Sequence, residues 1–324
     1  MNIQQLRFIH TVARNGLNIS QAAETLHTSQ PGISRQIRAL EDELGIEIFE
    51  RGGKQLTRIT SAGERILERA TKILDEVAAI RSLANEARHP SQGTLSIATT
   101  HSQARYVLPQ VMGRFRSKYP EVDINLHQGS AAQMTEMLES GEVDFCIVTE
   151  MLEETDNLVM MPCYQWVRGF VVPEGHELQK SPPKTLDDIA EYPLLTFMSG
   201  FTGRSALDRA FALKGLEPRV VFSATDADVI KTYVKLGLGV GIISRAAFDP
   251  QTDQGLVMLD ASDLFEKDVT RIGMRKGFHL RQFHFDFIEL FAPHLTETVV
   301  KQSLAARHAA QRKWLFLDEE LPLY

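Results

Sequence analysis

The sequence SQAAETLHTSQPGISRQIRALEDELGIEIFERGGK, which runs from Ser20 to Lys54, decides the fold of the N-terminal region. Its apolar residues are spaced as in two short amphipathic helices that pack at a steep angle. These residues are Ala22, Ala23, Leu26, Ile33, Ile37 and Leu40. Ser29 is a good N-cap, and Pro31 lies just inside the helix start, where a missing N–H costs nothing. We therefore predict a second helix from about Gln30 to Leu44, with its apolar side facing a core.

The other side of this second helix is polar and basic in its first turns. The side chains there belong to Gln30, Ser34, Arg35 and Arg38. A helix with such a face can place its N-terminal residues against base edges and phosphates in the major groove of DNA. Beyond the helix, Arg51 and Lys54 flank Gly52-Gly53, which fits a basic hairpin, or wing, on the phosphate backbone. We expect residues 1–60 to form a winged helix-turn-helix domain that binds DNA through these side chains.

A long helix is predicted next, from Ser61 to Arg88. Ile66, Ile73 and Ile80 recur every seven residues along it, with further apolar residues beside them. Such a wide apolar stripe favours pairing with the same helix of a second chain. The alternative is that the stripe packs on its own chain. The segment from His89 to Gly93 then breaks the helix, so we expect a linker and dimerisation region over 61–92.

From Thr94 onward, short strands alternate with helices. We expect strands at 95–99, 122–127, 144–148, 169–172, 194–197, 220–222, 240–243 and 270–274. We expect helices at 103–118, 131–140, 204–214, 226–236 and 282–291. This alternation implies an α/β fold built on parallel sheets with crossover helices.

The α/β pattern starts again at about Tyr164, which predicts two similar lobes within residues 93–324. We expect the first lobe to comprise 93–163 and 268–292, and the second to comprise 164–267. Two crossings of the chain between the lobes would leave a cleft. The segment 296–324 is also amphipathic, but its sequence pattern does not indicate which lobe it packs against.

Composition and charge are those of an ordinary globular protein. The 324 residues are 43% hydrophobic and 24% charged, with a net charge of −7. Cys146 and Cys163 both lie in apolar runs, which favours buried thiols over a disulfide. The first residues lack the pattern of a signal peptide, and no apolar run approaches the ~18 residues of a membrane span. We expect a soluble cytoplasmic protein.

Several polar residues of the second region fall where a strand ends and a helix begins. They are Thr100, Ser102 and Gln103, then Thr202 and Gly203, with Thr149 after a third strand. Ligands of open α/β sheets bind beyond the carboxyl ends of the strands. Free N–H groups and the positive end of a helix dipole favour an anion there. We expect these residues to bind a small anionic effector; the alternative is that the hydroxyls are simple helix caps.

Other candidate sites are weaker. The run Gly237–Gly241 precedes a strand, so a tight turn is favoured over a phosphate loop. The helix start favours N-capping and dipole pairing for Asp226 and Asp228, and Arg204 could contact a ligand or form an ion pair. The histidines show no metal-ligand spacing, and no nucleophile–base pair or pair of carboxylates points to catalysis. We expect no metal, no cofactor and no enzymatic activity.

The N-terminal motifs resemble those of the LysR-type transcriptional regulators. The matching residues are Ala22-Ala23, Leu26, Ser29-Gln30-Pro31, Ile33-Ser34, Gln36-Ile37, Leu40-Glu41, Leu44-Gly45, Ile48-Phe49, Arg51, Thr60 and Ala62-Gly63. The resemblance implies a winged helix-turn-helix, a linker helix and a two-lobed effector domain like a periplasmic binding protein. It also implies promoter DNA and a small effector as partners, and it favours a homotetramer.

Three later segments resemble one group within this family, the regulators of sulfur assimilation and cysteine biosynthesis. The segments are 97–106, 200–205 and 224–233. That group responds to acetylserine and to sulfate-like anions, so its hydroxyl-rich pocket corresponds here to Thr100, Ser102, Gln103, Thr149 and Thr202. Ser102 stands where the group usually has threonine, which keeps the hydroxyl and loses a methyl group.

Three other functions are possible. The chain could be a LysR-type regulator of another pathway with a different anionic effector. It could be a plain solute-binding protein, but the Ser20–Lys54 pattern and the missing signal peptide disfavour this. It could be an enzyme on the same fold, which the missing catalytic residues disfavour.

Overall fold

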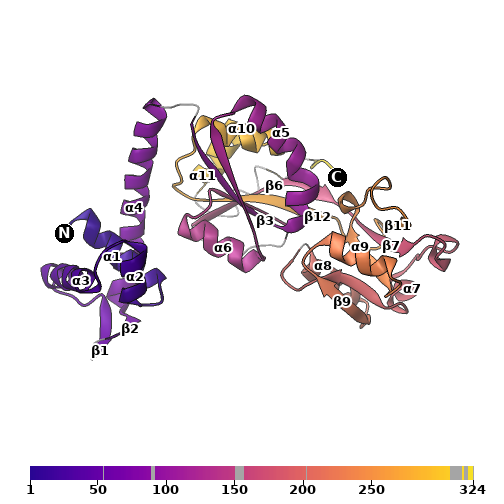
Figure 1. Cartoon of the computed structure of the whole chain (residues 1–324), viewed down its shortest axis with the longest axis horizontal. Helices are drawn as coiled ribbons and strands as arrows, with labels where there is room; N and C mark the ends of the chain where they lie inside the picture. Colours follow the sequence, from indigo (N-terminus) through magenta and orange to yellow (C-terminus); the bar gives the residue numbers. More distant parts are fainter. Residues whose placement is uncertain are drawn as a thin grey trace. The chain divides into compact units, whose positions relative to one another are not determined.

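A computed structural model describes residues 1–53, 55–88, 92–149, 157–201, 203–306, 316 and 320–323. The chain forms two compact units, Met1–Arg88 and His89–Tyr324 (Figure 1). The first is mainly helical with one hairpin, and the second is α/β.

The first unit is a three-helix core with a two-stranded hairpin. Its elements are α1 (Ile3–Arg14), α2 (Ile19–Thr25), α3 (Gln30–Leu44), β1 (Phe49–Gly52) and β2 (Gln55–Ile59). The Ser29 hydroxyl accepts a hydrogen bond from the Gly32 N–H at 3.3 Å, and Gly45 ends α3 in the left-handed conformation with φ of 69°. The predicted bounds of α3 are confirmed.

A buried carboxylate holds the hairpin against α3. Glu41 is only 7% exposed, and its Oε1 accepts hydrogen bonds from the N–H groups of Ile48 (2.9 Å) and Phe49 (3.1 Å). Its Oε2 pairs with Nη2 of Arg51 at 2.6 Å. The entrance to the wing is therefore fixed by one side chain of the preceding helix.

Helix α4 (Ser61–Arg88) follows the hairpin directly. Ala70 of α4 is buried in the core of the first unit, and Ile66, Leu67 and Leu74 pack beside it. Other apolar side chains of α4 are exposed: Ile73 by 40%, Ile80 by 64% and Leu83 by 50%. One part of the predicted stripe thus packs on its own chain, and another part is uncovered in this unit. Residues 89–91 of the predicted linker lie outside the described residues, and Gly93 already begins a strand.

The first lobe of the second unit has a five-stranded sheet in the order β4-β3-β5-β12-β6. The strands are β3 (Gly93–Thr99), β4 (Val122–Gln128), β5 (Phe145–Val148), β6 (Leu158–Trp166) and β12 (Asp268–Arg275). Strands β4, β3 and β5 are parallel to one another, whereas β12 is antiparallel to both of its neighbours, β5 and β6. The prediction of a wholly parallel sheet was wrong, because the chain enters and leaves this lobe through β6 and β12.

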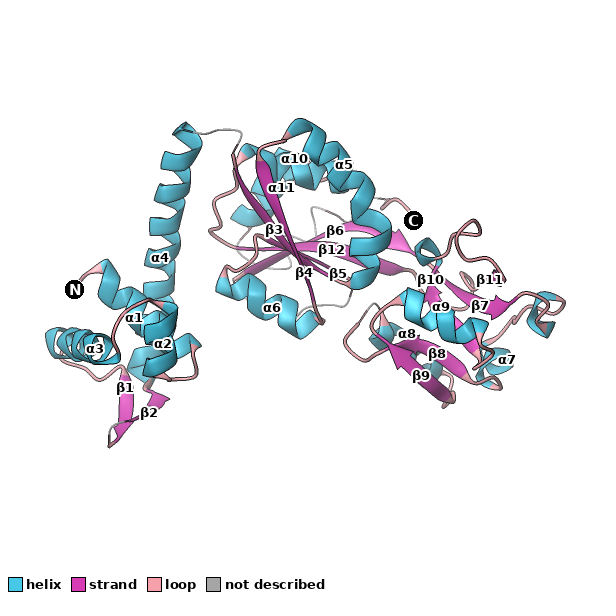
Figure 2. Ribbon diagram, viewed as in Figure 1, coloured by secondary structure: helices cyan, strands magenta, loops and turns pink. Residues whose placement is uncertain are grey.

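Helices cover both faces of this sheet (Figure 2). One face carries α5 (Leu108–Lys118), α10 (Gln282–Phe291) and α11 (Glu297–Ala305), and the other carries α6 (Ala131–Ser140). The predicted 103–118 helix begins as a π-helical turn, Gln103–Val107, before α5. In the C-terminal segment, α11 is followed by a short contact in which Gln165 N–H donates to the Pro322 carbonyl at 2.8 Å.

The second lobe repeats this plan with a sheet in the order β11-β7-β10-β8-β9. Its strands are β7 (Arg168–Pro173), β8 (Leu194–Phe197), β9 (Val220–Ala224), β10 (Val240–Ser244) and β11 (Leu256–Asp260). Helices α7 (Leu186–Ala190) and α8 (Arg204–Leu213) pack on one face, and α9 (Ala227–Lys235) packs on the other. Here too β7 and β11 are antiparallel to their neighbours, so this sheet is also mixed. Since β6 pairs with β12 as far as Trp166, the chain crosses to the second lobe at Val167.

The Glu41 contacts predict a large stability effect in the first unit. Glu41→Ala leaves two buried N–H groups without an acceptor and removes the partner of Arg51. We expect a loss of about 2–5 kcal/mol in the stability of this unit, measured by urea unfolding followed by circular dichroism. The matched control is Glu43→Ala, which removes an exposed acid of the same helix and should cost less than about 1 kcal/mol. Equal midpoints for the two variants would contradict this role of Glu41.

Candidate functional site

The predicted DNA-binding side chains of α3 share one exposed surface. Gln30, Ser34, Arg35 and Arg38 line a single hollow along the helix, together with Pro31, Ala39 and Asp42. The apolar side of the same helix is buried, so the polar face is turned away from the core. The arrangement has the shape and charge that a recognition helix requires.

The two described arginines of the wing, unlike the α3 side chains, are engaged in ion pairs within the protein. The Arg51 guanidinium is paired with the buried Glu41 carboxylate, so the fold itself accounts for an arginine at this position. Arg58 forms an exposed ion pair with Glu50. Lys54 lies outside the described residues.

In the second unit, Gln103 is the centre of a buried polar group. Its Nε2 donates to Oγ1 of Thr270 at 3.2 Å, and its Oε1 accepts a hydrogen bond from the hydroxyl of Tyr164. Oγ1 of Thr149 lies 3.5 Å from Oγ1 of Thr270. These bonds connect the first turn after β3 with β6, β12 and the end of β5. The predicted residues Gln103 and Thr149 are therefore brought together, through Thr270.

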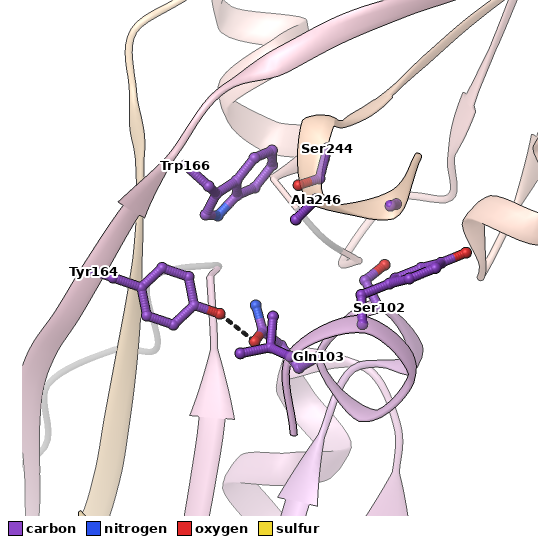
Figure 3. Close-up of a pocket in the computed structure, with 9 residues that line it drawn as sticks. Ser102, Gln103, Tyr164, Trp166, Ser244 and Ala246 are labelled. Carbon is purple, nitrogen blue, oxygen red and sulfur yellow. Dashed lines mark hydrogen bonds between the residues drawn. The ribbon is translucent and has the colours of Figure 1, made fainter. Parts of the chain in front are cut away.

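A cavity lies above Gln103, between the two lobes (Figure 3). The enclosed space between these side chains is about 10 Å³, close to what a single water molecule needs. The lining residues come from the π-helical turn, from β6 and from the end of β10 with the turn that follows: Ser102, Gln103, Tyr106, Val107, Tyr164, Trp166, Ser244, Ala246 and Ala247. Of the predicted effector residues, Ser102 and Gln103 line this cavity; Thr100 and Thr149 are buried near them but are not part of its wall.

Two polar atoms of the cavity residues lack a hydrogen-bond partner among the described residues. They are Oγ of Ser102 and Nε1 of Trp166, on side chains that are 5% and 3% exposed. A buried polar group without a partner is costly, so each such group calls for an explanation. A bound ligand that accepts both hydrogen bonds supplies one.

The helix-cap alternative fits Thr100 but not Ser102. Oγ1 of Thr100 accepts a long hydrogen bond (3.5 Å) from the N–H of Gln103. Ser102 occupies the N-cap position of the π-helical turn, yet its hydroxyl caps no N–H group. Helix capping therefore does not explain the Ser102 hydroxyl, which has no hydrogen-bond partner among the described residues.

The second predicted helix start is only partly described. Thr202 lies outside the described residues. Gly203 has φ of 71°, and its carbonyl accepts a hydrogen bond from Nη2 of Arg168 at 2.7 Å. A Cβ atom at Gly203 would lie 2.6 Å from that same nitrogen. Glycine is thus required here by the close approach of Arg168, which also pairs with Asp268.

The other candidates have structural roles. Asp226 is the N-cap of α9, and Arg204 pairs with Asp208 on its own helix. Gly237 and Gly239 have positive φ in the turn before β10. Among the residues that the structure describes, no cluster of metal-ligating side chains occurs, and no helix is long and apolar enough to span a membrane.

The sequence did not predict Tyr164, Trp166, Ser244 or Thr270 as site residues. They lie on strands, whereas the predicted site residues follow strand ends or open helices. The one available indication was the spacing of Tyr164 and Trp166, since alternate residues of a strand share a face.

Comparisons with known proteins agree with this architecture. Residues 3–64 match the model of the bacterial regulatory helix-turn-helix protein, lysR family, and residues 88–296 match the LysR substrate binding domain. The chain is 48% identical to the HTH-type transcriptional regulator CysB of Haemophilus influenzae, over 99% of both chains. It is 46% identical to the regulator SsuR of Burkholderia cenocepacia, over 93% of this chain and 97% of that one.

Among solved structures, the cofactor-binding domain of the Cbl transcriptional regulator is similar, with a TM-score of 0.63 and 41% identity. The match covers 66% of this chain and 95% of that domain. The similarity therefore extends over the two-lobed region that contains the cavity.

The polar group around Gln103 predicts a cost for losing the Thr270 hydroxyl. Thr270→Val keeps the shape of the side chain but leaves the Gln103 amide without its acceptor in a fully buried position. We expect a loss of about 1–3 kcal/mol in unfolding free energy, measured by urea denaturation. Thr135→Val, which removes a half-buried hydroxyl bonded within α6, is the control and should cost less. The assignment fails if the control is the more damaging of the two.

Proposed function

Because the chain belongs to the LysR family of bacterial transcriptional regulators, we propose that it controls genes of sulfur assimilation and cysteine biosynthesis. In this proposal, the α3 face reads promoter DNA, and a small anion, sulfate or the carboxylate of acetylserine, binds in the cavity between the lobes. The similarity to CysB supports the pathway, since the sulfur-assimilation resemblance of residues 97–106 falls on the cavity itself.

The observation that carries the effector proposal is the pair of unpartnered donors, Ser102 Oγ and Trp166 Nε1. Both are neutral, and the cavity wall beside them contains no acidic side chain. A small anion accepts hydrogen bonds from both groups, and these bonds offset part of the cost of taking its charge out of water. Ligand binding can then alter DNA binding only if the ligand has different affinities for two arrangements of the protein.

The alternative is a LysR-type regulator of another pathway with a different anionic effector. Serine at position 102, where the sulfur group usually has threonine, is the observation that favours it. The smaller side chain leaves room for one more methyl group on the ligand. The two possibilities differ in which anion stabilises the protein.

A panel of thermal melts distinguishes these effectors. We expect sulfate, thiosulfate or an acetylserine to raise the midpoint in proportion to the logarithm of concentration above its dissociation constant. Ser102→Ala should weaken the binding of that same compound about ten- to a hundredfold, because a hydrogen bond to a charged group contributes roughly 1.5–3 kcal/mol. Ser117→Ala, which removes a serine hydroxyl on α5 outside the cavity, is the control. A compound outside the sulfur group that alone stabilises the wild type would favour the alternative.

The DNA proposal rests on the exposed face of α3. Arg35→Ala should weaken specific binding to promoter DNA by about 1–3 kcal/mol, because the arginine reaches base edges or close phosphates. A quantitative gel-shift measures this effect, with Arg114→Ala in the second unit as a charge-matched control. If the affinity of the doubly substituted Ser34→Ala, Arg35→Ala protein is unchanged, the recognition surface lies elsewhere.

We also propose that the uncovered apolar side chains of α4 pair subunits, within a tetramer. Ile73→Glu places a charge in that contact, which is costly to desolvate, so sedimentation should show smaller species. Promoter affinity should fall as well, since paired half-sites need paired subunits. Ala78→Glu, an exposed position about 140° further around the helix, should keep the wild-type assembly. A folded Ile73→Glu protein with unchanged assembly would refute the contact.

A further inference from the structure

Tyr106 belongs to the first lobe by sequence but packs in the second. It lies on the π-helical turn Gln103–Val107, and its ring contacts the apolar cluster formed by α9 and the strands beneath it. Its hydroxyl donates to Oδ1 of Asp228 in α9 at 2.7 Å. Nζ of Lys231 lies over the ring, 5.3 Å from its centroid. The side chain is therefore held by the second lobe on its hydroxyl and on one face.

Asp228 is the point where these contacts meet. Its Oδ1, which bonds to the Tyr106 hydroxyl, also pairs with the buried Lys231 ammonium at 3.0 Å. Its Oδ2 lies 3.3 Å from Nε of the exposed Arg105. Lys231 is itself fixed by Asp253 at 2.9 Å and by the carbonyl of Ala247 at 2.8 Å. The acceptor for Tyr106 is thus held rigidly within the second lobe.

The Asp228 carboxylate is ionised near neutral pH, because its pKa is lowered. Partial burial of its carboxyl group opposes ionisation, but hydrogen bonds from Tyr106 and Lys231 outweigh that effect and lower its pKa below the ordinary value. A lowered pKa means that the stabilising contact is present at neutral pH and is lost only when the pH falls through that lowered value.

The π-helical turn connects this contact with the effector cavity. Ser102 and Gln103 lie at its start and Tyr106 near its end, and all three side chains line the cavity. Gln103 is bonded within the first lobe, to Thr270 and Tyr164, whereas Tyr106 is bonded to the second. One short turn, of a kind often found at functional sites, therefore joins both lobes along one wall of the cavity.

We propose that Tyr106 and Asp228 are positioning residues whose contact holds the two lobes in the closed arrangement that completes the effector cavity. The expected effect of this contact on ligand affinity rests on the proposed function. The effect on the closure of the two lobes does not, because closure requires no ligand. Without the contact, the lobes separate more often, the cavity loses its Tyr106 wall, and Trp166 becomes accessible to solvent.

Trp166 provides a direct measurement of closure. The chain has two tryptophans, Trp166 and Trp314, so Trp314→Phe leaves Trp166 as the single tryptophan, which can be excited selectively over the tyrosines at long wavelength. Trp166 is 3% exposed when the lobes are closed. In that background, Tyr106→Phe should raise the acrylamide quenching constant of Trp166 at least twofold without ligand. Tyr119→Phe and Tyr192→Phe are matched controls, because each removes a tyrosine–carboxylate bond within one lobe, to Asp286 and to Glu177.

A double-mutant cycle tests whether the two residues act through one contact. Asp228→Ala alone should raise quenching at least as much as Tyr106→Phe does, because it also removes the ion pair with Arg105, and adding Tyr106→Phe to it should cause no further increase. Sulfate and N-acetylserine titrations of the same proteins should show dissociation constants raised about three- to tenfold, as expected when the competent state is less populated. Unchanged quenching in both single variants, or additive effects in the double variant, would overturn the proposal. If neither compound binds the wild type, the proposed effector is wrong, while the quenching result still decides closure.

Discussion

The hydrogen bonds of Gln103 are the constraint on which the arrangement of the second unit depends. One buried amide accepts from Tyr164 on β6 and donates to Thr270 on β12, the two strands through which the chain passes between the lobes. These bonds fix the π-helical turn at the mouth of the cleft. In this position of the turn, the Ser102 hydroxyl caps no backbone N–H group. The Tyr106 side chain points to the opposite lobe and bonds to Asp228 there. The cavity and the contact between the lobes thus have a common structural origin.

The first unit shows the same division between structure and function on a smaller scale. Glu41 anchors the wing through two backbone N–H groups and Arg51. The polar face of α3, with Gln30, Arg35 and Arg38, lies at the surface, away from these contacts. In both units, buried polar groups set the backbone, and the residues available for a partner are those that the backbone does not use. In the second unit, the unpartnered groups Ser102 Oγ and Trp166 Nε1 indicate the candidate site.

Much of the fold could be predicted from local sequence. The bounds of α3, α6, β8 and α10 follow from caps, prolines and apolar periodicity. Strand β6 was missed because Pro162 interrupts its pattern. A proline is tolerated there since β6 is the edge of its sheet, with a register shift opposite it at Thr270 and Arg271. Without β6, the antiparallel pair that closes the sheet could not be inferred, and both sheets were predicted to be parallel.

The candidate site could be predicted only where it follows from local geometry. Ser102 and Gln103 were found because a strand ends and a helix begins there, but Thr270 and Tyr164 are brought to Gln103 by long-range pairing that leaves no local pattern. The engagement of Arg51 by Glu41 likewise depends on the turn between α3 and β1. The π-helical turn is a third example, since periodicity alone predicts a continuous helix from Gln103 to Lys118.

The central claim is that a small anion binds between the lobes on Ser102 and Trp166. The most direct measurement is a crystal structure of the full chain grown with selenate, a sulfate analogue whose anomalous scattering locates it without ambiguity. We expect a single anomalous peak in the cavity, with selenate oxygens within hydrogen-bond distance of Ser102 Oγ and Trp166 Nε1. A cavity that is empty both in these crystals and in crystals grown with acetylserine, or an anion bound only at other side chains, would contradict it.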